Sequence, residues 1–285
     1  MDLSIIIVNY KTEELTRQCL QSVYACDLKD WTYEVILVDN ASGDGSAQAA
    51  VQAFPQTRLI LNDANLGFSK ANNIGMAAAS GDYVLLLNSD TVVEADTFYR
   101  SLRYMKANPE IGALGCKVLL PDGCLDVACK RSFPTPLNSL CHMSRLDRVF
   151  PQNPVVGAYN LTFLDPDKIY SVDCLVGAYM MVSRDVIELV GTLDEDYFMY
   201  GEDIDWCYRI KEAGYLVVYY PKVSITHYKK ASGLGRKNPQ TIEAFYDAMK
   251  IFYGKHYQDK YDGLTARMVL GGTQVLKKIA LLRNH

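Results

Sequence analysis

The first third of the chain alternates short apolar runs of strand length with stretches of helical periodicity, and this alternation restricts the fold more than any other feature. Strands are expected over residues 3–9, 33–39, 57–61 and 83–87, and helices over residues 13–25, 47–53 and 68–79. Strands separated by helices of this length imply right-handed βαβ units and a mostly parallel sheet. The sequence therefore predicts an α/β fold, in which ligands bind beyond the carboxyl ends of the strands.

The later part of the chain has a less regular pattern. Helices are expected over residues 94–107 and 202–213 and from about residue 240, and strands over residues 111–120, 172–182 and 215–220. The tripeptide PDG at 121–123 is typical of a hairpin turn. Residues 131–170 contain Pro134, Pro136, Pro151, Pro154 and Pro166. We expect this region to be a long functional loop. Gly81 is expected to end the Ala-rich helix over 68–79.

Composition excludes several classes of protein. The chain has 285 residues, 49% of them hydrophobic, which suits one large α/β domain or two small ones. A net charge of −4 argues against a general nucleic-acid binder. The N-terminal apolar run is too short for a signal peptide, and no stretch approaches the roughly 18 apolar residues of a membrane span. The eight scattered cysteines form no CxxC motif, so free thiols in a reducing, cytoplasmic compartment are expected.

Acidic residues follow two of the expected strands. Asp39 ends one strand, and Asn88-Ser89-Asp90 follows another. Asp39 has two interpretations, an Asx turn or a carboxylate that accepts an N–H of a pyrimidine base. Asp90 caps the next helix or binds Mg²⁺ or Mn²⁺ against a diphosphate, since such sites use few carboxylates plus substrate phosphates.

A third acidic group and a histidine lie later in the chain. In FMYGEDIDWCYR (198–209), Glu202, Asp203 and Asp205 crowd a helix N-terminus, where the helix dipole favours negative charge. The aromatic residues before Asp203 also suit a partly desolvated general base. His227, beyond a strand, is either structural or a ligand of metal or phosphate. The glycines at 43 and 45 form no dinucleotide-binding motif, since Gln48 stands where the third glycine is needed.

Seven motifs occur in an order that resembles one enzyme family. They are SIIIVNYK, VILVDNASGDGS, NLGFSKANNIG, GDYVLLLNSD, GAYMMVSRDV, GTLDEDYFMYGEDIDWCYRIKEAGY and ITHYKKAS. Together they resemble family 2 inverting glycosyltransferases of the GT-A fold over roughly residues 3–235, and the rhamnosyltransferase-like branch most closely.

The resemblance implies roles for individual residues. Asp203 is implied as the catalytic base, with Glu202 or Asp205 as the next candidates. Asp90 in the DxD-like motif and His227 are implied as ligands of Mn²⁺ or Mg²⁺, although Asn88 replaces the first aspartate. The implied donor-binding residues are Val8 and Tyr10 at the nucleoside, Asp39 at the base, Asn65, Gly67 and Asn73 near the ribose and diphosphate, Ser89 beside the metal, and Gly177 and Ala178 at the sugar.

The implied reaction moves a sugar from a nucleotide-diphosphate donor, best matched by dTDP-rhamnose, to a saccharide or lipid-linked saccharide of the cell envelope. A UDP-sugar remains an alternative donor, because uracil and thymine share the N3–H edge. A sugar nucleotidyltransferase would need a Gly- and Arg-rich N-terminal loop, which IIIVNYKTEE lacks. A non-catalytic nucleotide-sugar-binding module is the other alternative. The expected catalytic domain is residues 1–237, divided into a nucleotide-sugar half (1–120) and an acceptor half (121–237), with a helical extension over 238–285.

The last segment has two interpretations. One helical face of residues 264–283 carries apolar side chains and the other basic ones, which is typical of a helix lying on an anionic membrane. The alternative is a helix packed on the catalytic domain, weakened by Gly271-Gly272. The apolar positions are Leu264, Met268, Val275, Ile279 and Leu282, and the basic ones are Arg267, Lys277, Lys278 and Arg283. Peripheral attachment at the inner face of the membrane is expected.

Overall fold

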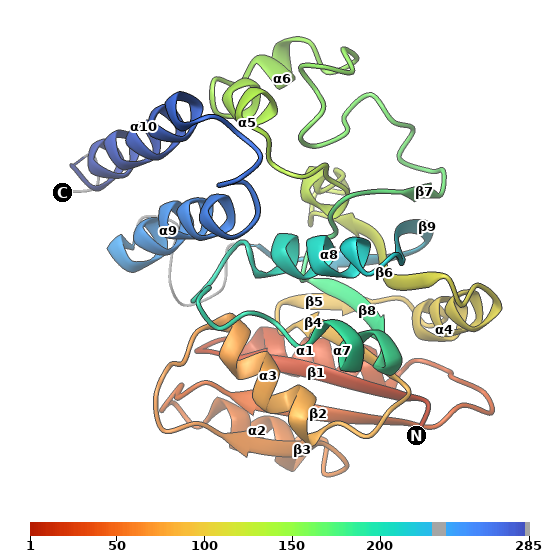
Figure 1. The fold of residues 1–285 in the computed structure, drawn as a ribbon. Helices are drawn as coiled ribbons and strands as arrows, with labels where there is room; N and C mark the ends of the chain where they lie inside the picture. The colour runs from red at the N-terminus through yellow and green to blue at the C-terminus, as the bar shows by residue number, and fades with distance from the viewer. Residues whose placement is uncertain (230–237, 283–285) are drawn as a thin grey trace.

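A computed structural model describes residues 1–229 and 238–282, and its centre is one mixed β-sheet (Figure 1). The strand order is β3-β2-β1-β4-β8-β6-β9-β5, with β7 also paired to β9. The strands are β1 (Leu3–Asn9), β2 (Tyr33–Asp39), β3 (Arg58–Leu61), β4 (Tyr83–Asn88), β5 (Thr91–Val93), β6 (Ile111–Leu119), β7 (Tyr170–Ser171), β8 (Tyr179–Ser183) and β9 (Leu216–His227).

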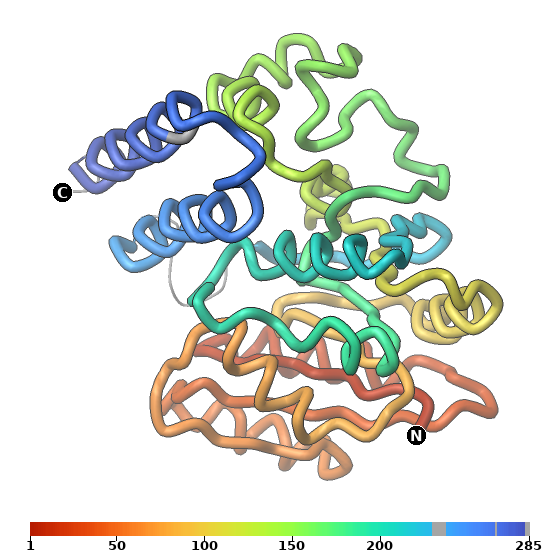
Figure 2. The backbone as a smooth tube through the Cα atoms, in the orientation of Figure 1, coloured from red at the N-terminus to blue at the C-terminus, as the bar shows by residue number. Residues whose placement is uncertain are grey.

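Helices cover both faces of this sheet (Figure 1). They are α1 (Glu13–Tyr24), α2 (Ser46–Ala53), α3 (Phe68–Ala78), α4 (Thr97–Ala107), α5 (Pro136–Met143), α6 (Leu146–Val149), α7 (Arg184–Val190), α8 (Glu202–Glu212), α9 (Pro239–His256) and α10 (Gly263–Leu282). Figure 2 shows that the first part of the chain, in red and orange, forms one end of the molecule, and the green and blue segments form the other.

The first four strands confirm the predicted parallel arrangement. β1 lies between β2 and β4 and is parallel to both, with Val8 opposite Val38 on one side and Asn88 on the other. Helices cover both faces here, so the strands are continuous apolar runs, as buried parallel strands require. The seven predicted elements of this region each lie within one or two residues of the observed bounds, because local periodicity alone specifies them.

Antiparallel pairs join the second half to the first. β8 is antiparallel to both β4 and β6, whereas β9 is parallel to β6 and antiparallel to β5. The strand predicted over 215–220 continues to His227, because a register irregularity after Cys116 in β6 accommodates Pro221. This longer strand carries His227 to the edge of the sheet where β4 ends.

Four local predictions need correction. Residues 131–170, predicted to be irregular, contain α5 and α6, and the helix α7 was missed. Only the last part of the strand predicted over 172–182 is a strand, β8 (Tyr179–Ser183), and β7 (Tyr170–Ser171) lies before the predicted range. The helix predicted from residue 94 starts at Thr97, because β5 occupies Thr91–Val93. Gly81 does not end α3: it packs against β1, where a Cβ atom would lie 2.5 Å from the Ser4 nitrogen.

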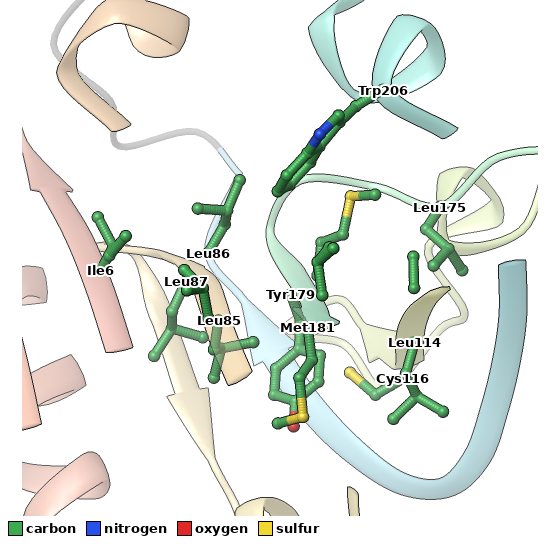
Figure 3. Packing of buried hydrophobic residues seen from close by; sticks show 14 of the residues in the cluster. Ile6, Leu85, Leu86, Leu87, Leu114, Cys116, Leu175, Tyr179, Met181 and Trp206 are labelled. Atoms are coloured by element: carbon green, nitrogen blue, oxygen red, sulfur yellow. The ribbon is translucent and has the colours of Figure 1, made fainter. Parts of the chain in front are cut away.

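The main core extends through both halves of the sheet, from Leu20 of α1 and Ile6 of β1 to Trp206 of α8. Figure 3 shows Trp206 of α8 above Tyr179 and Met181 of β8, with Leu85, Leu86 and Leu87 of β4 beside them. All eight cysteines are free and seven are buried, which confirms their predicted role as core residues. Burial raises the pKa of the Cys19 thiol to about 12, so this thiol is inert at neutral pH.

The C-terminal helices pack on this core from one side. Phe252 of α9 makes an edge-on contact with Tyr208 of α8, with 5.8 Å between the ring centroids. The predicted domain boundary at residue 237 lies outside the described residues, and the predicted subdivision stays a prediction. In the described part of the chain, no helix has both the length and the apolar content needed to cross a membrane.

Candidate active site

The predicted acidic residues gather along one edge of the sheet because of the strand register. Asp39, the last residue of β2, lies opposite Asn9 at the end of β1, and Asn88 of β4 lies opposite Val8. Neighbouring strands are about 4.8 Å apart, so the ends of β2 and β4 are separated by roughly 10 Å. A row of polar side chains therefore borders this edge, as predicted for a parallel sheet.

Asp39 is buried and held by two hydrogen bonds. Its Oδ1 accepts from Asn9 Nδ2 at 2.7 Å, and its Oδ2 accepts from the Ser42 backbone nitrogen at 3.1 Å. The second bond is the Asx-type turn expected as the structural interpretation. Asn9, which sequence reasoning missed, also donates to Ser46 Oγ at 2.9 Å. Its signal was a polar residue that ends the apolar run of the first strand.

The loop after β3 joins the same edge. Asn40 Nδ2 donates to Asn65 Oδ1 at 2.8 Å and to the Gly67 carbonyl at 3.2 Å. Gly67 has φ +83°, and a Cβ atom there would lie 2.4 Å from the Phe198 carbonyl oxygen. The glycine is therefore required both by its backbone conformation and by the close approach of the chain that leads into α8.

Asn73 and Ser89 have other partners. Asn73 Nδ2 donates to the Leu193 carbonyl at 2.8 Å and to Glu195 Oε1 at 3.0 Å, which ties α3 to the chain before α8. Ser89 Oγ lies 3.1 Å from Thr12 Oγ1, below the sheet edge. Val8 and Tyr10 are half-buried at the end of β1. None of these four residues has a hydrogen bond to Asp90 or Asp203 in the described part of the chain.

Asp90 and His227, predicted as metal ligands, lie together. His227 Nε2 is 3.0 Å from Asp90 Oδ1 and 3.3 Å from Asn88 Nδ2, and both side chains are 7% exposed. The pairing of β5 with β9 produces this contact, because His227 stands opposite Thr91, the residue after Asp90.

These residue types suit a divalent cation. Asn88 Oδ1 is buried and has no hydrogen-bond partner, and Nδ2 of the same amide lies against the His227 imidazole, so Asn88 adds an amide group to the Asp90–His227 pair. No three His, Cys, Asp or Glu side chains are grouped for metal binding within residues 1–229 and 238–282. A cation here would therefore need additional oxygen ligands, such as diphosphate.

Asp126 lies behind His227 and was missed by sequence reasoning. Its Oδ2 is 4.0 Å from His227 Nδ1, the ring nitrogen that faces away from Asp90. Lys229 Nζ forms an ion pair with the same carboxylate at 2.6 Å. This separation exceeds hydrogen-bond distance, and in the described part of the chain His227 Nδ1 has no hydrogen-bond partner, so Asp126 acts on the imidazole only through its nearby charge. The nearby hairpin turn gave no signal of this carboxylate.

Asp203 lies at the N-terminus of α8, and both of its carboxylate oxygens accept hydrogen bonds. Its Oδ2 accepts from Arg131 Nη2 at 2.7 Å and from the Gly177 nitrogen at 3.3 Å, and its Oδ1 accepts from the Ile204 nitrogen at 2.8 Å. Burial by itself lowers the pKa of Arg131, but the adjacent Asp203 carboxylate raises it well above its ordinary value. Arg131 and Asp203 therefore form a buried ion pair.

The two other acidic residues in the first turn of α8, Glu202 and Asp205, differ from Asp203. Burial, and after it the charge of Asp203, raises the pKa of Glu202 to about 8. Glu202 Oε2 is buried and has no hydrogen-bond partner. Asp205 is bonded to Arg209 Nε at 2.8 Å and to His256 Nε2 at 2.7 Å, which leaves it a structural role. Among the three, Asp203 alone has a described contact with the predicted donor-sugar residues.

The dipeptide Gly177-Ala178 joins the Asp90 and Asp203 groups. The Gly177 nitrogen donates to Asp203 Oδ2, and the Ala178 carbonyl accepts from the Asn88 nitrogen at 3.1 Å. The antiparallel pairing of β4 with β8 places the start of β8 at the end of β4. The residues predicted to bind the metal, at the end of β4, and the predicted base Asp203 therefore lie on either side of this dipeptide.

Comparisons with known proteins identify the family of this chain. A model described as glycosyl transferase family 2 matches residues 4–124, and one described as glycosyl transferase family group 2 matches residues 83–250. N-acetylglucosaminyl-diphospho-decaprenol L-rhamnosyltransferase of Mycobacterium tuberculosis is 33% identical over 264 residues, which covers 88% of this chain and 83% of that protein. Rhamnosyltransferase WbbL of Escherichia coli is 26% identical and covers 79% of this chain and 82% of WbbL.

Solved structures show the same fold. Mannosyltransferase PcManGT from Pyrobaculum calidifontis, in complex with GDP-Man and Mn²⁺, has a TM-score of 0.61 at 18% identity and covers 99% of this chain and 72% of that chain. GalNAc-T7 with UDP, GalNAc and Mn²⁺ has a TM-score of 0.63 at 13% identity, covering 90% and 48% of the two chains. The predicted family and GT-A fold are confirmed: the chain belongs to glycosyl transferase family 2 and is a glycosyltransferase.

Proposed function

We propose that this enzyme transfers L-rhamnose from dTDP-rhamnose, with inversion, to a hydroxyl of a lipid-linked saccharide in cell-envelope synthesis. The observation that carries the proposal is the row formed by Asp39, Asp90 and Asp203 along one edge of the sheet, with Gly177-Ala178 between the last two. The sugar and the acceptor class follow the names of the mycobacterial and E. coli relatives.

The proposed donor site runs along the ends of β2, β1 and β4. Asp39 accepts the N3–H of the base, beside Val8 and Tyr10. The loop with Asn65 and Gly67 borders the ribose and diphosphate, and Gly177-Ala178 borders the sugar. Each oxygen of Asp39 accepts one hydrogen bond, which fixes the carboxylate and leaves it free lone pairs for the base, and a fixed carboxylate loses little entropy when it binds. Asn73 and Ser89 are proposed to act only by holding this edge of the sheet.

Asp90 and His227, with Asn88 Oδ1, would hold a Mn²⁺ or Mg²⁺ ion together with the donor diphosphate. Such an ion, when bound, offsets the charge that develops on the leaving diphosphate. Asp90 is the only carboxylate directly at this site among the described residues, since Asn88 replaces the first aspartate of the motif.

Asp203 is proposed to take the proton of the acceptor hydroxyl. The acceptor oxygen forms a bond to the anomeric carbon while the bond from that carbon to the diphosphate oxygen breaks. The proton moves to Asp203, and the electron pair of the broken bond leaves with the nucleoside diphosphate. One displacement inverts the anomeric configuration. Only one carboxylate moves a proton, in contrast to the paired carboxylates of glycosidases.

Testing a panel of donors separates the candidates. Purified enzyme is incubated with dTDP-rhamnose, UDP-glucose, UDP-GlcNAc and GDP-mannose, each with and without a GlcNAc-diphosphate-lipid acceptor, and nucleotide release is measured. Acceptor-dependent release from dTDP-rhamnose alone is the expected result. Nucleotide release from a UDP-sugar instead would show that this sugar, and not dTDP-rhamnose, is the donor. Donor binding without any nucleotide release would favour a non-catalytic binding module.

We also propose that α10 contacts the membrane peripherally. The five apolar positions of its predicted face are all exposed, from 40% at Ile279 to 74% at Leu282. The opposite interpretation, a helix packed on the catalytic domain, has support too, since Val269 and Leu270 pack on the core and Lys277 pairs with Asp247 of α9. One face of α10 therefore packs on the protein, and its main apolar face points outward. Of the four predicted basic positions, Arg283 lies outside the described residues.

A further inference from the structure

The helices α5 and α6 carry a concentrated set of exposed apolar side chains. Their exposed fractions range from 38% at Met143 to 66% at Val149. We name these residues the α5–α6 surface: Leu137, Leu140, Met143, Leu146, Val149 and Phe150. Large apolar side chains that are exposed singly are ordinary, but six within fourteen residues form a patch that indicates a binding partner.

These helices have the reverse of the usual amphipathic arrangement. The residues they bury are Asn138, Cys141 and Asp147, of which two are polar. A surface helix of a soluble protein normally buries its apolar face and exposes its polar one. The apolar residues of α5 and α6 are therefore unsuited to contact with water alone.

A polar network on the inner side holds the two helices in this orientation. His142 Nδ1 lies 2.7 Å from Asp147 Oδ2, which joins α5 to α6, and Asn160 Nδ2 is 3.1 Å from the same histidine nitrogen. Thr135 and Asn138 form a capping box at the start of α5. Because these contacts are specific, the outward direction of the apolar side chains is a built feature of the fold.

The charges beside the surface fit an anionic partner. Arg145 and Arg148 are exposed, and neither forms an ion pair within the described part of the chain. The one acidic residue of α6, Asp147, is buried against His142. The surface therefore presents two unpaired cations although the whole chain has a net charge of −4. Each such cation strengthens binding to anionic lipid by roughly fivefold.

The α5–α6 surface borders a cavity on the same segment of chain that leads to the proposed catalytic base. Leu137 lines a cavity of about 400 Å³ together with Phe133, Val155 and Tyr257. Phe133 follows Arg131 by two residues, so their Cα atoms lie within about 8 Å of each other, and Arg131 contacts Asp203. In Figure 1, α5, α6 and α10 all lie at the end of the molecule opposite α2 and β3.

We propose that the α5–α6 surface docks on the anionic lipid bilayer that carries the acceptor. Its apolar side chains enter the interface, Arg145 and Arg148 contact lipid phosphates, and the saccharide reaches Asp203 while its lipid stays in the membrane. This inference rests on the function proposed above, since it concerns how the enzyme reaches an acceptor that is anchored in the membrane.

The test uses the full chain and vesicles, without any sugar transfer. The variant Leu140→Glu/Val149→Glu places two charges on the surface, and Leu189→Glu on α7, 63% exposed, is the matched control. Each protein is sedimented with vesicles of phosphatidylcholine mixed with phosphatidylglycerol. The double variant should bind about tenfold more weakly or worse, whereas the control should bind like the unaltered protein. Because no donor is present, failure of the proposed transferase function leaves this result unaffected.

A second variant tests the charges separately. Arg145→Glu/Arg148→Glu should abolish the preference for vesicles with phosphatidylglycerol over pure phosphatidylcholine. Light scattering without vesicles measures the oligomeric state of every protein. Unchanged vesicle binding by both variants overturns the proposal. The proposal is also overturned if the unaltered protein is a dimer and Leu140→Glu/Val149→Glu is a monomer that binds vesicles as before. The α5–α6 surface would then join two copies of the chain.

Discussion

Asp203 Oδ2 and Arg131 Nη2 lie 2.7 Å apart, in an ion pair whose side chains are only 11% and 10% exposed. Arg131 Nη2 also donates to the Leu175 carbonyl at 2.6 Å, and Arg131 Nε is buried with no partner. The proposed base is thus held in one orientation by a cation that reaches it from the chain before α5. Acceptance of a proton by Asp203 would leave that cation uncompensated, so Arg131 influences both the position and the reactivity of the base.

Replacing Asp203 by Asn should lower the turnover rate by about 10²–10⁴-fold, because the amide cannot accept the proton of the acceptor hydroxyl. Donor affinity, measured by calorimetry with dTDP-rhamnose, should change little. Glu202→Gln is the matched control at the neighbouring position and should retain most activity at neutral pH. Near-normal turnover of Asp203→Asn together with an inactive Glu202→Gln would transfer the role of base to Glu202.

Replacing Arg131 by Met should reduce the turnover rate, because Asp203 then loses the ion pair that holds its carboxylate in one orientation. Loss of one partner of a buried pair also destabilises the fold by about 3–5 kcal/mol, which denaturant unfolding measures. Arg131→Lys keeps the charge and should restore part of the turnover rate and of the stability. Reduced stability with the turnover rate of the unaltered enzyme per folded molecule would indicate a purely structural role.

Removing divalent cations with a chelator should abolish transfer, and Mn²⁺ or Mg²⁺ should restore it. Asp90→Ala should be inactive under all conditions, since it removes the one carboxylate at the proposed site. His227→Ala should need more Mn²⁺ for half-maximal activity, because it removes the imidazole beside Asp90. Full activity in excess chelator would contradict the metal assignment, and the substitution of Asn at position 88 would then explain the difference from the DxD pattern.

The buried carboxyl of Glu202 should make stability depend on pH. Its pKa is raised from 4.5 to about 8 in the folded protein, so the folded state binds a proton that the unfolded state releases. Its contribution to stability is therefore fully present below about pH 4.5 and is lost as the pH rises towards 8. Glu202→Gln stays neutral, so its free energy of unfolding should decrease less between pH 5 and pH 8 than that of the unaltered protein. Urea unfolding at the two pH values measures this difference. An equal decrease in both proteins would refute the raised pKa of Glu202.

Removing residues 264–285 should weaken sedimentation with anionic vesicles and leave turnover on a soluble acceptor largely intact. Because Val269 and Leu270 pack on the core, the truncation also tests whether the fold needs α10. The variant Met268→Glu/Val275→Glu keeps those contacts and charges only the exposed face. Normal vesicle binding by this variant would assign α10 to the core or to a contact between subunits.

Local sequence pattern accounted for the elements of the first half. The strands and helices from Leu3 to Asn88 follow from side-chain periodicity, because each is specified by residues near one another in the chain. The same reasoning placed Asp39 and Asp90 at the ends of parallel strands. It failed for α5, where Pro136 marks a helix start and was read as a loop residue.

The sequence by itself thus determined the α/β class, the family motifs and the acidic residues of the site. Only the tertiary structure decided which distant residues meet them. Arg131 reaches Asp203 across 72 residues of chain, and His227 reaches Asp90 because β9 continues past Pro221 to pair with β5. It also decided that α5 exposes apolar side chains, since burial depends on what packs against a helix. Contacts of this kind depend on strand register and packing between distant segments, which no local pattern encodes.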